Sequence, residues 1–348
     1  MTGGITSPGA GWRQADQGPA VQQRTGRKRR HRGRGRHRGE VPMVEDVEFT
    51  SYYGRQIVKT PVWKSPDVPL YLFLGGAAGS SAILGALADL TDRPTLTRVS
   101  RLTAGAGSLA SVVFLIHDLG RPERFLHMLR VIKPTSPLSI GSYILAPFSA
   151  AAGATAAVEL LGWFPRLKRF GGAVAAAFGG PLATYTGVLL ANTAVPSWHA
   201  PHTQLPYVFG GSAMAAGGGI TMAFTPVEEA GPARKMAITG AVVELAAMHK
   251  VETDHGILSE PYHEGRPGAL MRAAQVCTAA GATLTAVAGR RRWGAVASGT
   301  LLAAGSLLTR FGVFEAGIAS TKDPKYVVVP QKERLAARQQ EHADTTTR

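Results

Sequence analysis

The chain has 348 residues, 45% of them hydrophobic and 18% charged, and carries a formal net charge of +15. Its single cysteine, Cys277, excludes a disulfide within the chain and any cysteine-ligated zinc or iron–sulfur site that the chain builds alone. Much of the positive charge lies in residues 24–38, and the other basic residues mostly stand at the ends of apolar runs, so we expect no nucleic-acid partner for the folded part.

The N-terminal segment, residues 1–66, is polar and is predicted to be disordered. Residues 1–42 are rich in Gly, Arg and Gln and lack the apolar stretch of a signal peptide. A sequence of different character begins at Met43, which favours Met43 as the true start and the preceding residues as a gene-model artefact. The alternative is a genuine basic arm that contacts anionic lipid or nucleic acid.

Apolar residues are concentrated at 67–320, the predicted folded domain, and a polar C-terminal tail follows at 321–348. Eight apolar runs there approach or exceed the ~20 residues that cross a ~30 Å hydrocarbon core as helix. They cover 68–90, 99–117, 138–163, 172–194, 206–224, 233–250, 268–289 and 293–318. Their Gly, Ala and Ser content suits close helix packing in lipid better than a helix in water. We predict an all-α integral membrane protein of the cell membrane with about eight transmembrane helices; a large soluble helical protein is the alternative.

Compact basic clusters stand at residues 166–169 and 290–292, each between two predicted spans. The positive-inside rule places these loops in the cytoplasm. An even number of spans then places both termini on the opposite face, with the loops at 118–137, 195–205 and 251–267. The basic N-terminus would itself prefer the cytoplasm, so the two signals conflict unless the basic arm is not part of the protein.

The sequence HDLGRPERFLHML at 117–129 ends the second predicted span with charged residues. Asp118 and Arg121 stand three residues apart, and Gly120 with Pro122 would turn the chain into a short second helix. An amphipathic pattern suited to the membrane interface follows, with apolar residues at Phe125, Leu126, Leu129 and Ile132. Two interpretations stay open: an interfacial anchor whose Asp–Arg pair closes a turn, or part of a functional site.

Other polar groups stand at the start of the first span and within the fourth. Asp67 and Tyr71 open the first, and Tyr185 lies about halfway along the fourth, where its hydroxyl needs a partner. His199 and His202 have the spacing of a metal pair, but no third ligand is near, so we expect no metal. The histidines fall at span ends or in loops, which disfavours haem.

Three charged residues interrupt later apolar runs. Glu244 lies in the sixth run, and Arg310 and Glu315 lie in the eighth. Charges at such depth usually face an interior cavity or one another. Because Arg310 and Glu315 are five residues apart, slightly off one face, we expect each to find a partner on another helix. Buried ion pairs and a proton path are both open.

Several stretches together carry a family resemblance, and they follow in order along the apolar segment. They are W-x7-Y-L-F-L-G-G-x-A-G-S at 63–80, H-D-L-G-R-P-x-R-F at 117–125, S-P-L-S-I-G-S-Y at 136–143, Y-T-G-V-L-L at 185–190 and R-x-G-V-F-x-A-G at 310–317. With these stretches the chain resembles the NrfD/PsrC family, the integral membrane subunit of polysulfide reductase and of related nitrite, thiosulfate, formate and tetrathionate respiratory complexes.

The resemblance implies two four-helix bundles without haem or metal of their own. It also implies a menaquinone or other quinone as bound substrate, and electron exchange with a ferredoxin-like four-cluster iron–sulfur subunit that connects to a molybdopterin catalytic subunit. Carried over by position, the expected quinone-binding residues are Asp67, Tyr71, His117, Asp118, Arg121 and Tyr185. Family members often have His or Asn at the start of the first span, where this chain has Asp67 and Tyr71, and Trp at the position of Tyr143.

Two other classes of function remain beside a quinone-reactive anchor that could also translocate protons. A secondary transporter would suit eight spans and intramembrane charges, although no convincing internal repeat is present. A purely structural membrane anchor is the third possibility.

Overall fold

The structure is a computed structural model that describes residues 56–121, 123–162 and 164–346. The predictions for residues 1–55, including a start at Met43, lie outside the described residues. The described residues form eleven α-helices and one 3₁₀ helix, with no strand among them. The prediction of an all-α protein is therefore confirmed.

Eight long helices occupy the eight predicted runs. They are α1 (Asp67–Leu90), α2 (Pro94–Leu119), α4 (Pro137–Leu161), α5 (Pro165–Ala191), α7 (Leu205–Phe224), α8 (Gly231–Thr253), α9 (Gly265–Ala288) and α10 (Arg292–Lys322). Five of them, α1, α2, α4, α5 and α10, are long and apolar enough by length and composition to cross a membrane. Proline opens α2, α4 and α5, where its missing N–H has no intrahelical partner to lose, so these helices start earlier than the apolar runs do.

Short elements complete the chain between and after the long helices. They are α3 (Glu123–Met128), α6 (Pro196–His199), the 3₁₀ helix η1 (Gly256–Tyr262) and α11 (Lys325–Thr346). Gly120 ends α2 in a left-handed conformation with φ 72°, as its place in the sequence predicts. The amphipathic helix that follows is shorter than expected, because α3 ends before Leu129 and Ile132. Helix α11 covers most of residues 321–348, the segment that the sequence predicts only to be a polar tail.

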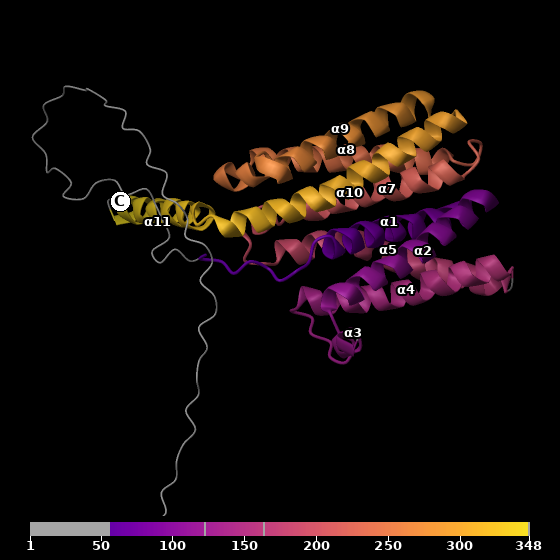
Figure 1. The fold of residues 1–348 in the computed structure, drawn as a ribbon, viewed down its shortest axis with the longest axis horizontal. Helices are drawn as coiled ribbons and strands as arrows, with labels where there is room; N and C mark the ends of the chain where they lie inside the picture. Colours follow the sequence, from indigo (N-terminus) through magenta and orange to yellow (C-terminus); the bar gives the residue numbers. More distant parts are fainter. Residues whose placement is uncertain (1–55, 122, 163, 347–348) are drawn as a thin grey trace, which may run out of the picture. The chain divides into compact units, whose positions relative to one another are not determined.

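The long helices pack in two sets of four (Figure 1). Helices α1, α2, α4 and α5 form the first helix group, and α7, α8, α9 and α10 form the second. The groups meet mainly through α1 and α5 on one side and α7 and α10 on the other. We name the end where α1 begins and α10 finishes the tyrosine end, because Tyr71 and Tyr185 lie near it. The opposite end, which carries residues 166–169 and 290–292, is the basic end.

Glycine allows the closest helix contacts. A Cβ atom at Gly79 of α1 would overlap the backbone of Gly179 in α5, and the reverse also holds. Gly219 of α7 and Gly299 of α10 approach each other in the same way. Packing of this kind replaces the hydrophobic driving force that helices lack inside lipid, which is the physical reason for the high glycine content.

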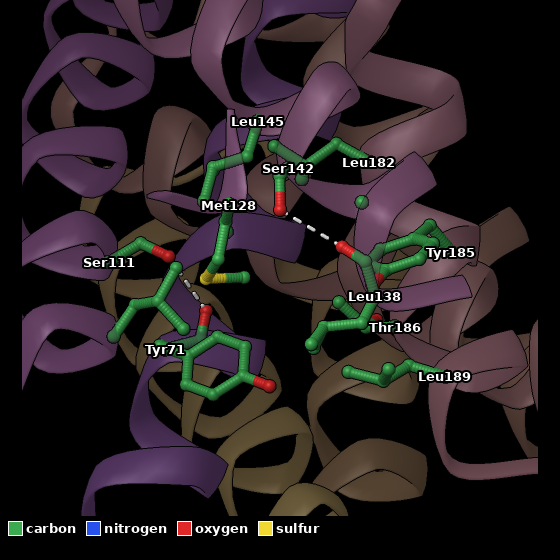
Figure 2. A pocket seen from close by; sticks show the side chains of 13 residues that line it. Tyr71, Ser111, Met128, Leu138, Ser142, Leu145, Leu182, Tyr185, Thr186 and Leu189 are labelled. Carbon is green, nitrogen blue, oxygen red and sulfur yellow. Dashed lines mark hydrogen bonds between the residues drawn. The ribbon is translucent and has the colours of Figure 1, made fainter. Parts of the chain in front are cut away.

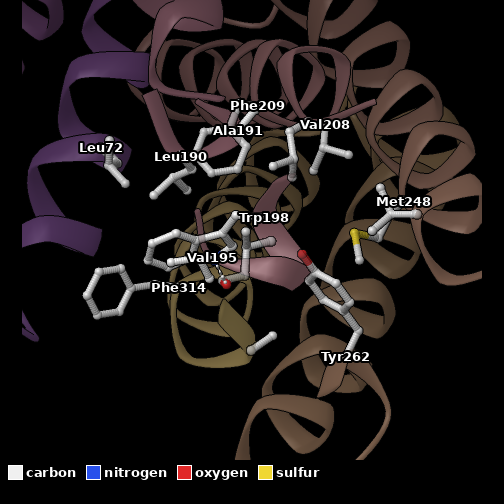
Figure 3. Packing of buried hydrophobic residues seen from close by; sticks show 14 of the residues in the cluster. Leu72, Leu190, Ala191, Val195, Trp198, Val208, Phe209, Met248, Tyr262 and Phe314 are labelled. Atoms are coloured by element: carbon white, nitrogen blue, oxygen red, sulfur yellow. Dashed lines mark hydrogen bonds between the residues drawn. The ribbon is translucent and has the colours of Figure 1, made fainter. Parts of the chain in front are cut away.

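The connection between α5 and α7 contributes buried residues to the core at the tyrosine end, among them Val195 and Trp198 (Figure 3). Trp198 is fully buried, and its Nε1–H donates a hydrogen bond of 2.7 Å to the carbonyl of Val313. Its ring stacks on Trp63 with a centroid distance of 5.6 Å. The hydroxyl groups of Thr60 and Thr321 are 3.1 Å apart. Residues 56–66, part of the segment predicted to be disordered, therefore make defined contacts with the helices.

Candidate functional site

A narrow cavity of about 40 Å³ lies in the first helix group near the tyrosine end (Figure 2). The wall comes from α1, α2, α3, α4 and α5, and its residues are Tyr71, Gly75, Ser111, Leu115, Met128, Leu138, Gly141, Ser142, Leu145, Leu182, Tyr185, Thr186 and Leu189. Most of the wall is apolar, with a few hydroxyl groups.

The ring of Tyr185 packs directly against Gly141 of α4. A Cβ atom at Gly141 would overlap the Cζ and Oη atoms of the Tyr185 ring, so only glycine at this position of α4 leaves room for the phenol. The adjacent Ser142 donates its Oγ–H to the carbonyl of Leu138 at 2.9 Å. The S-P-L-S-I-G-S sequence thus supplies a socket for a side chain of α5.

Tyr71 comes from the opposite wall of the same cavity (Figure 2). Ser111 of α2 donates its Oγ–H to the Tyr71 carbonyl at 3.0 Å, which joins α2 to α1 at this level. Neither the Tyr71 nor the Tyr185 hydroxyl makes a hydrogen bond to another group in the part of the chain that the structure describes. Two phenol donors therefore remain for a polar ligand inside an apolar wall.

Asp67 and His117 form a polar pair just outside the cavity. The Asp67 Oδ2 lies 2.8 Å from the His117 Nδ1. The Asp67 side chain is 7% exposed and that of His117 is 73% exposed. Asp67 precedes Tyr71 by four residues in α1, a rise of about 6 Å. A buried carboxyl one helical turn before Tyr71 thus contacts an imidazole that is exposed to solvent.

Asp118 and Arg121 do not pair with each other. The Asp118 Oδ1 accepts a hydrogen bond of 2.9 Å from the backbone N–H of Lys64, and the Lys64 ammonium lies 3.4 Å from the carbonyl of His117. Arg121 is exposed and outside the cavity wall. The interpretation that an Asp–Arg pair closes the turn is wrong, because Asp118 instead accepts its hydrogen bond from Lys64 in the segment before α1. Pro122 lies outside the described residues.

The depth expected for Tyr185 also needs correction. Because α5 starts at Pro165, Tyr185 lies in the last third of the helix and not halfway along it. This position brings it level with the first turns of α1 and α4, where Tyr71 and Gly141 lie. Gly141, Ser111 and Ser142 are site residues that sequence reasoning missed; the S-P-L-S-I-G-S sequence was the available signal for two of them.

A second polar cluster lies inside the second helix group. Glu244 and Arg310 are 2% and 0% exposed. Thr309 donates its Oγ1–H to the Glu244 Oε1 at 2.6 Å, and the Arg310 Nη2 donates to the carbonyl of Phe209 at 2.9 Å. The Glu244 Oε2 and the Arg310 Nε and Nη1 have no hydrogen-bond partner among the described residues. The two charges attract each other without a direct ion pair.

Glu315 belongs to a different environment. Its Oε2 lies 3.3 Å from the Nε of Arg266 at the start of α9, and the Arg266 side chain is 78% exposed. Arg310 and Glu315 thus have partners on other helices, as their spacing predicts. Glu315 lies near the tyrosine end and is not part of the interior cluster around Glu244.

Among the described residues, no group of three or more His, Cys, Asp and Glu side chains is arranged to hold a metal ion. The rings of His199 and His202 stack 5.8 Å apart. Their Nδ1 atoms face the carbonyls of Ala191 and His199, at 3.0 Å and 3.2 Å.

Long apolar helices packed against one another through glycine define a multi-pass membrane protein. Residues 56–248, more than half of the chain, match the family described as "Polysulphide reductase, NrfD", and the chain belongs to this family. It is an integral membrane subunit of a polysulphide or nitrite reductase-type complex, so the family predicted from the motifs is confirmed. The sequence has no significant match among curated proteins.

Proposed function

We propose that this chain is the quinone-reactive membrane subunit of a respiratory molybdopterin and iron–sulfur oxidoreductase. Menaquinone or another quinone binds in the tyrosine-end cavity, and electrons pass between it and a ferredoxin-like four-cluster iron–sulfur subunit. That subunit connects to a molybdopterin catalytic subunit. The family membership supports the complex, and the single cysteine of this chain fits redox centres supplied by partners.

The observation that carries the proposal is the placement in one apolar cavity of two phenol groups that have no hydrogen-bond partner among the described residues. Tyr71 and Tyr185 reach it from α1 and α5, and Gly141 makes room for the second ring. A quinone has two carbonyl acceptors on an apolar ring, so two donors and an apolar wall match its chemistry.

Reduction of a quinone to a quinol consumes two electrons and two protons, and oxidation releases them. The tyrosines bind and orient the ring through its oxygens. Asp67 and His117 are the proposed proton-exchange groups, because they contact each other, one is buried one helical turn before Tyr71 and the other meets solvent. Asp118 holds the segment before α1 in place through Lys64, and the exposed Arg121 is assigned to the rim of the site.

All eight long helices cross the membrane in this proposal, and each four-helix group is one bundle. The basic end faces the cytoplasm by the positive-inside rule. The tyrosine end then faces the opposite side, where the iron–sulfur subunit docks. Glu244 and Arg310 are candidates for proton translocation in the second bundle, because a buried carboxyl with an unpartnered oxygen can exchange a proton with transient water.

The test uses the purified complex in detergent. It should retain menaquinone or another quinone, measurable after solvent extraction. Tyr185→Phe should lower quinone-linked turnover about tenfold, the effect of one lost hydrogen bond to a polar ligand. Tyr143→Phe is the matched control, because the Tyr143 hydroxyl donates to the Leu129 carbonyl at 2.8 Å and is not part of the cavity wall. Equal turnover in both variants would contradict the site.

A further inference from the structure

A second cavity lies in the first helix group towards the basic end. It has a volume of about 10 Å³, and its wall includes Ala82 of α1, Arg101 and Ala104 of α2, Thr155 of α4 and Gly172 of α5. We call it the inner cavity. The same four helices surround the tyrosine-end cavity, so the two cavities follow each other along the inside of one helix group.

Arg101 places a buried guanidinium on the wall of the inner cavity. The residue is 7% exposed, and its Nε and Nη2 pack against Gly172 of α5, where a Cβ atom would lie at an ordinary contact distance of 3.4 Å. The Arg101 Nη1 lies 3.2 Å from the Glu159 Oε2, and the Nη2 lies 3.3 Å from the Asp89 Oδ2. The Nε has no hydrogen-bond partner within the described chain.

Thr155 is a second unsatisfied group on the same wall. It is 3% exposed, and its Oγ1 has no partner among the described residues. Buried polar groups without partners are costly and are commonly satisfied by internal water. A cavity of this size has room for about one water molecule between these groups.

Charged side chains connect the inner cavity to the surface of the basic end. The Glu159 Oε1 lies 3.4 Å from the Lys168 ammonium. The Asp89 Oδ2 lies 3.4 Å from the Nε of Arg169, whose side chain is 73% exposed. Two carboxylates thus offset the charge of Arg101 and offer proton-exchanging groups between solvent and the cavity.

Only a short interval separates the two cavities. Ala104 lines the inner cavity and Ser111 lines the tyrosine-end cavity, and seven residues of helix rise about 10 Å. Ser108 lies between them in α2 and is 1% exposed. Ala78 of α1 belongs to an apolar cluster but lines neither cavity, whereas Ala82 of the same cluster lines the inner cavity.

We propose that the inner cavity holds water exchanging with the aqueous phase at the basic end, and that it forms the inner part of a proton route to the tyrosine-end cavity. The water claim stands alone, whereas the route claim rests on the proposed quinone function. Protons enter past Asp89 and Glu159, reach the water beside Arg101 and Thr155, and cross the last 10 Å or so by Ser108 and transient water.

The water claim is tested with Ag⁺, an ion of about the size of water, on the intact complex in membrane vesicles with Cys277→Ser as background. Ala82→Cys places a thiol on the cavity wall, and Ala78→Cys places one a helical turn away in the apolar cluster. Ag⁺ added at the basic end should react with the thiol of Ala82→Cys at least about tenfold faster than with that of Ala78→Cys. The reason is that an ion enters hydrated space but not a dry packed interior. Peptide mass spectrometry after alkylation gives the blocked fraction. Equal rates would overturn the water claim.

The route claim is tested with Thr155→Val, which removes the hydroxyl and keeps the shape. Thr285→Val is the matched control, because Thr285 is also buried but lies in the second helix group and donates to the Gly281 carbonyl. Thr155→Val should slow quinone-linked turnover several-fold and raise its solvent deuterium isotope effect, with the bound quinone content unchanged. An unchanged rate and isotope effect would overturn the route. Loss of bound quinone in the parent complex would instead contradict the proposed function, and the Ag⁺ result would still decide the water claim.

Discussion

The Asp67 Oδ2 and the His117 Nδ1 lie 2.8 Å apart and join the first turn of α1 to the last turn of α2. His117→Ala leaves a buried carboxyl without this partner, so we expect a loss of about 1–3 kcal/mol in unfolding free energy. Thermal unfolding of the purified complex measures it. His127→Ala, at an exposed position of α3, is the control. Asp67→Asn combined with His117→Ala should cost less than the sum of the two changes; additivity would contradict the pairing.

Gly141→Ala should displace the Tyr185 ring, because the new methyl group would occupy the space of the Tyr185 Cζ and Oη. We expect loss of bound quinone and of quinone-linked turnover. Gly153→Ala in the same helix is the matched control, since its Cβ would meet nothing within 4 Å. The control should fold as well as the parent or gain about 0.5–1 kcal/mol. Retention of quinone in Gly141→Ala would show that the ring can move without consequence.

Asp118→Asn should be nearly silent, because asparagine keeps a side-chain oxygen that can accept the Lys64 N–H. Asp118→Ala removes the acceptor and should loosen residues 56–66, which hold Trp63 against Trp198. Limited proteolysis before α1 and quinone-linked turnover report the two effects. A large effect of Asp118→Asn would show instead that the charge of Asp118 takes part in proton exchange.

Glu244 and Arg310 should depend on each other, because both are buried and their charges attract. Removal of one partner of a buried charge pair costs about 3–5 kcal/mol, whereas removal of both costs far less. Glu244→Gln and Arg310→Met are therefore each expected to lower the unfolding temperature of the complex, and the double variant should recover part of the loss. A double variant no better than the worse single one would argue against coupling.

The docking of α11 should depend on pH. The Lys325 ammonium lies 2.8 Å from the Glu260 Oε2 in η1 and lowers the pKa of Glu260 below its usual 4.5. The carboxylate of Glu260 in turn raises the pKa of Lys325 above its usual 10.5. At pH values above its usual pKa, the Glu260 carboxylate stabilises the docking of α11. This stabilisation is lost as the pH falls through the lowered pKa of Glu260. At pH values below its usual pKa, the Lys325 ammonium stabilises the docking of α11. This stabilisation is lost as the pH rises through the raised pKa of Lys325.

Docking of α11 should therefore be firmest between these limits, by the roughly 0.2–1 kcal/mol of an exposed ion pair. Proteolysis within α11 across the pH range measures it. Glu260→Gln should remove the increase in cleavage at acid pH; an increase that persists in this variant would assign it to another group.

The sequence by itself determined the eight long helices, the membrane location and the family. Apolar runs of membrane length and prolines at helix starts are local signals, so they can be read without knowing the neighbours. It also identified Tyr71 and Tyr185, because the family motifs include them.

Only the tertiary structure decided which side chains meet. In the structure, Gly141 lies against the Tyr185 ring, and Asp118 accepts a hydrogen bond from Lys64 instead of pairing with Arg121. Glu315 contacts Arg266, and Arg101 lies on the wall of the inner cavity. These contacts join residues of different helices or of the segment before α1. They depend on how each helix is rotated about its axis and where its neighbour crosses it, and glycine contacts between backbones set both. No local pattern of residue types encodes that geometry, which is why the partners of the buried charges had to come from the fold.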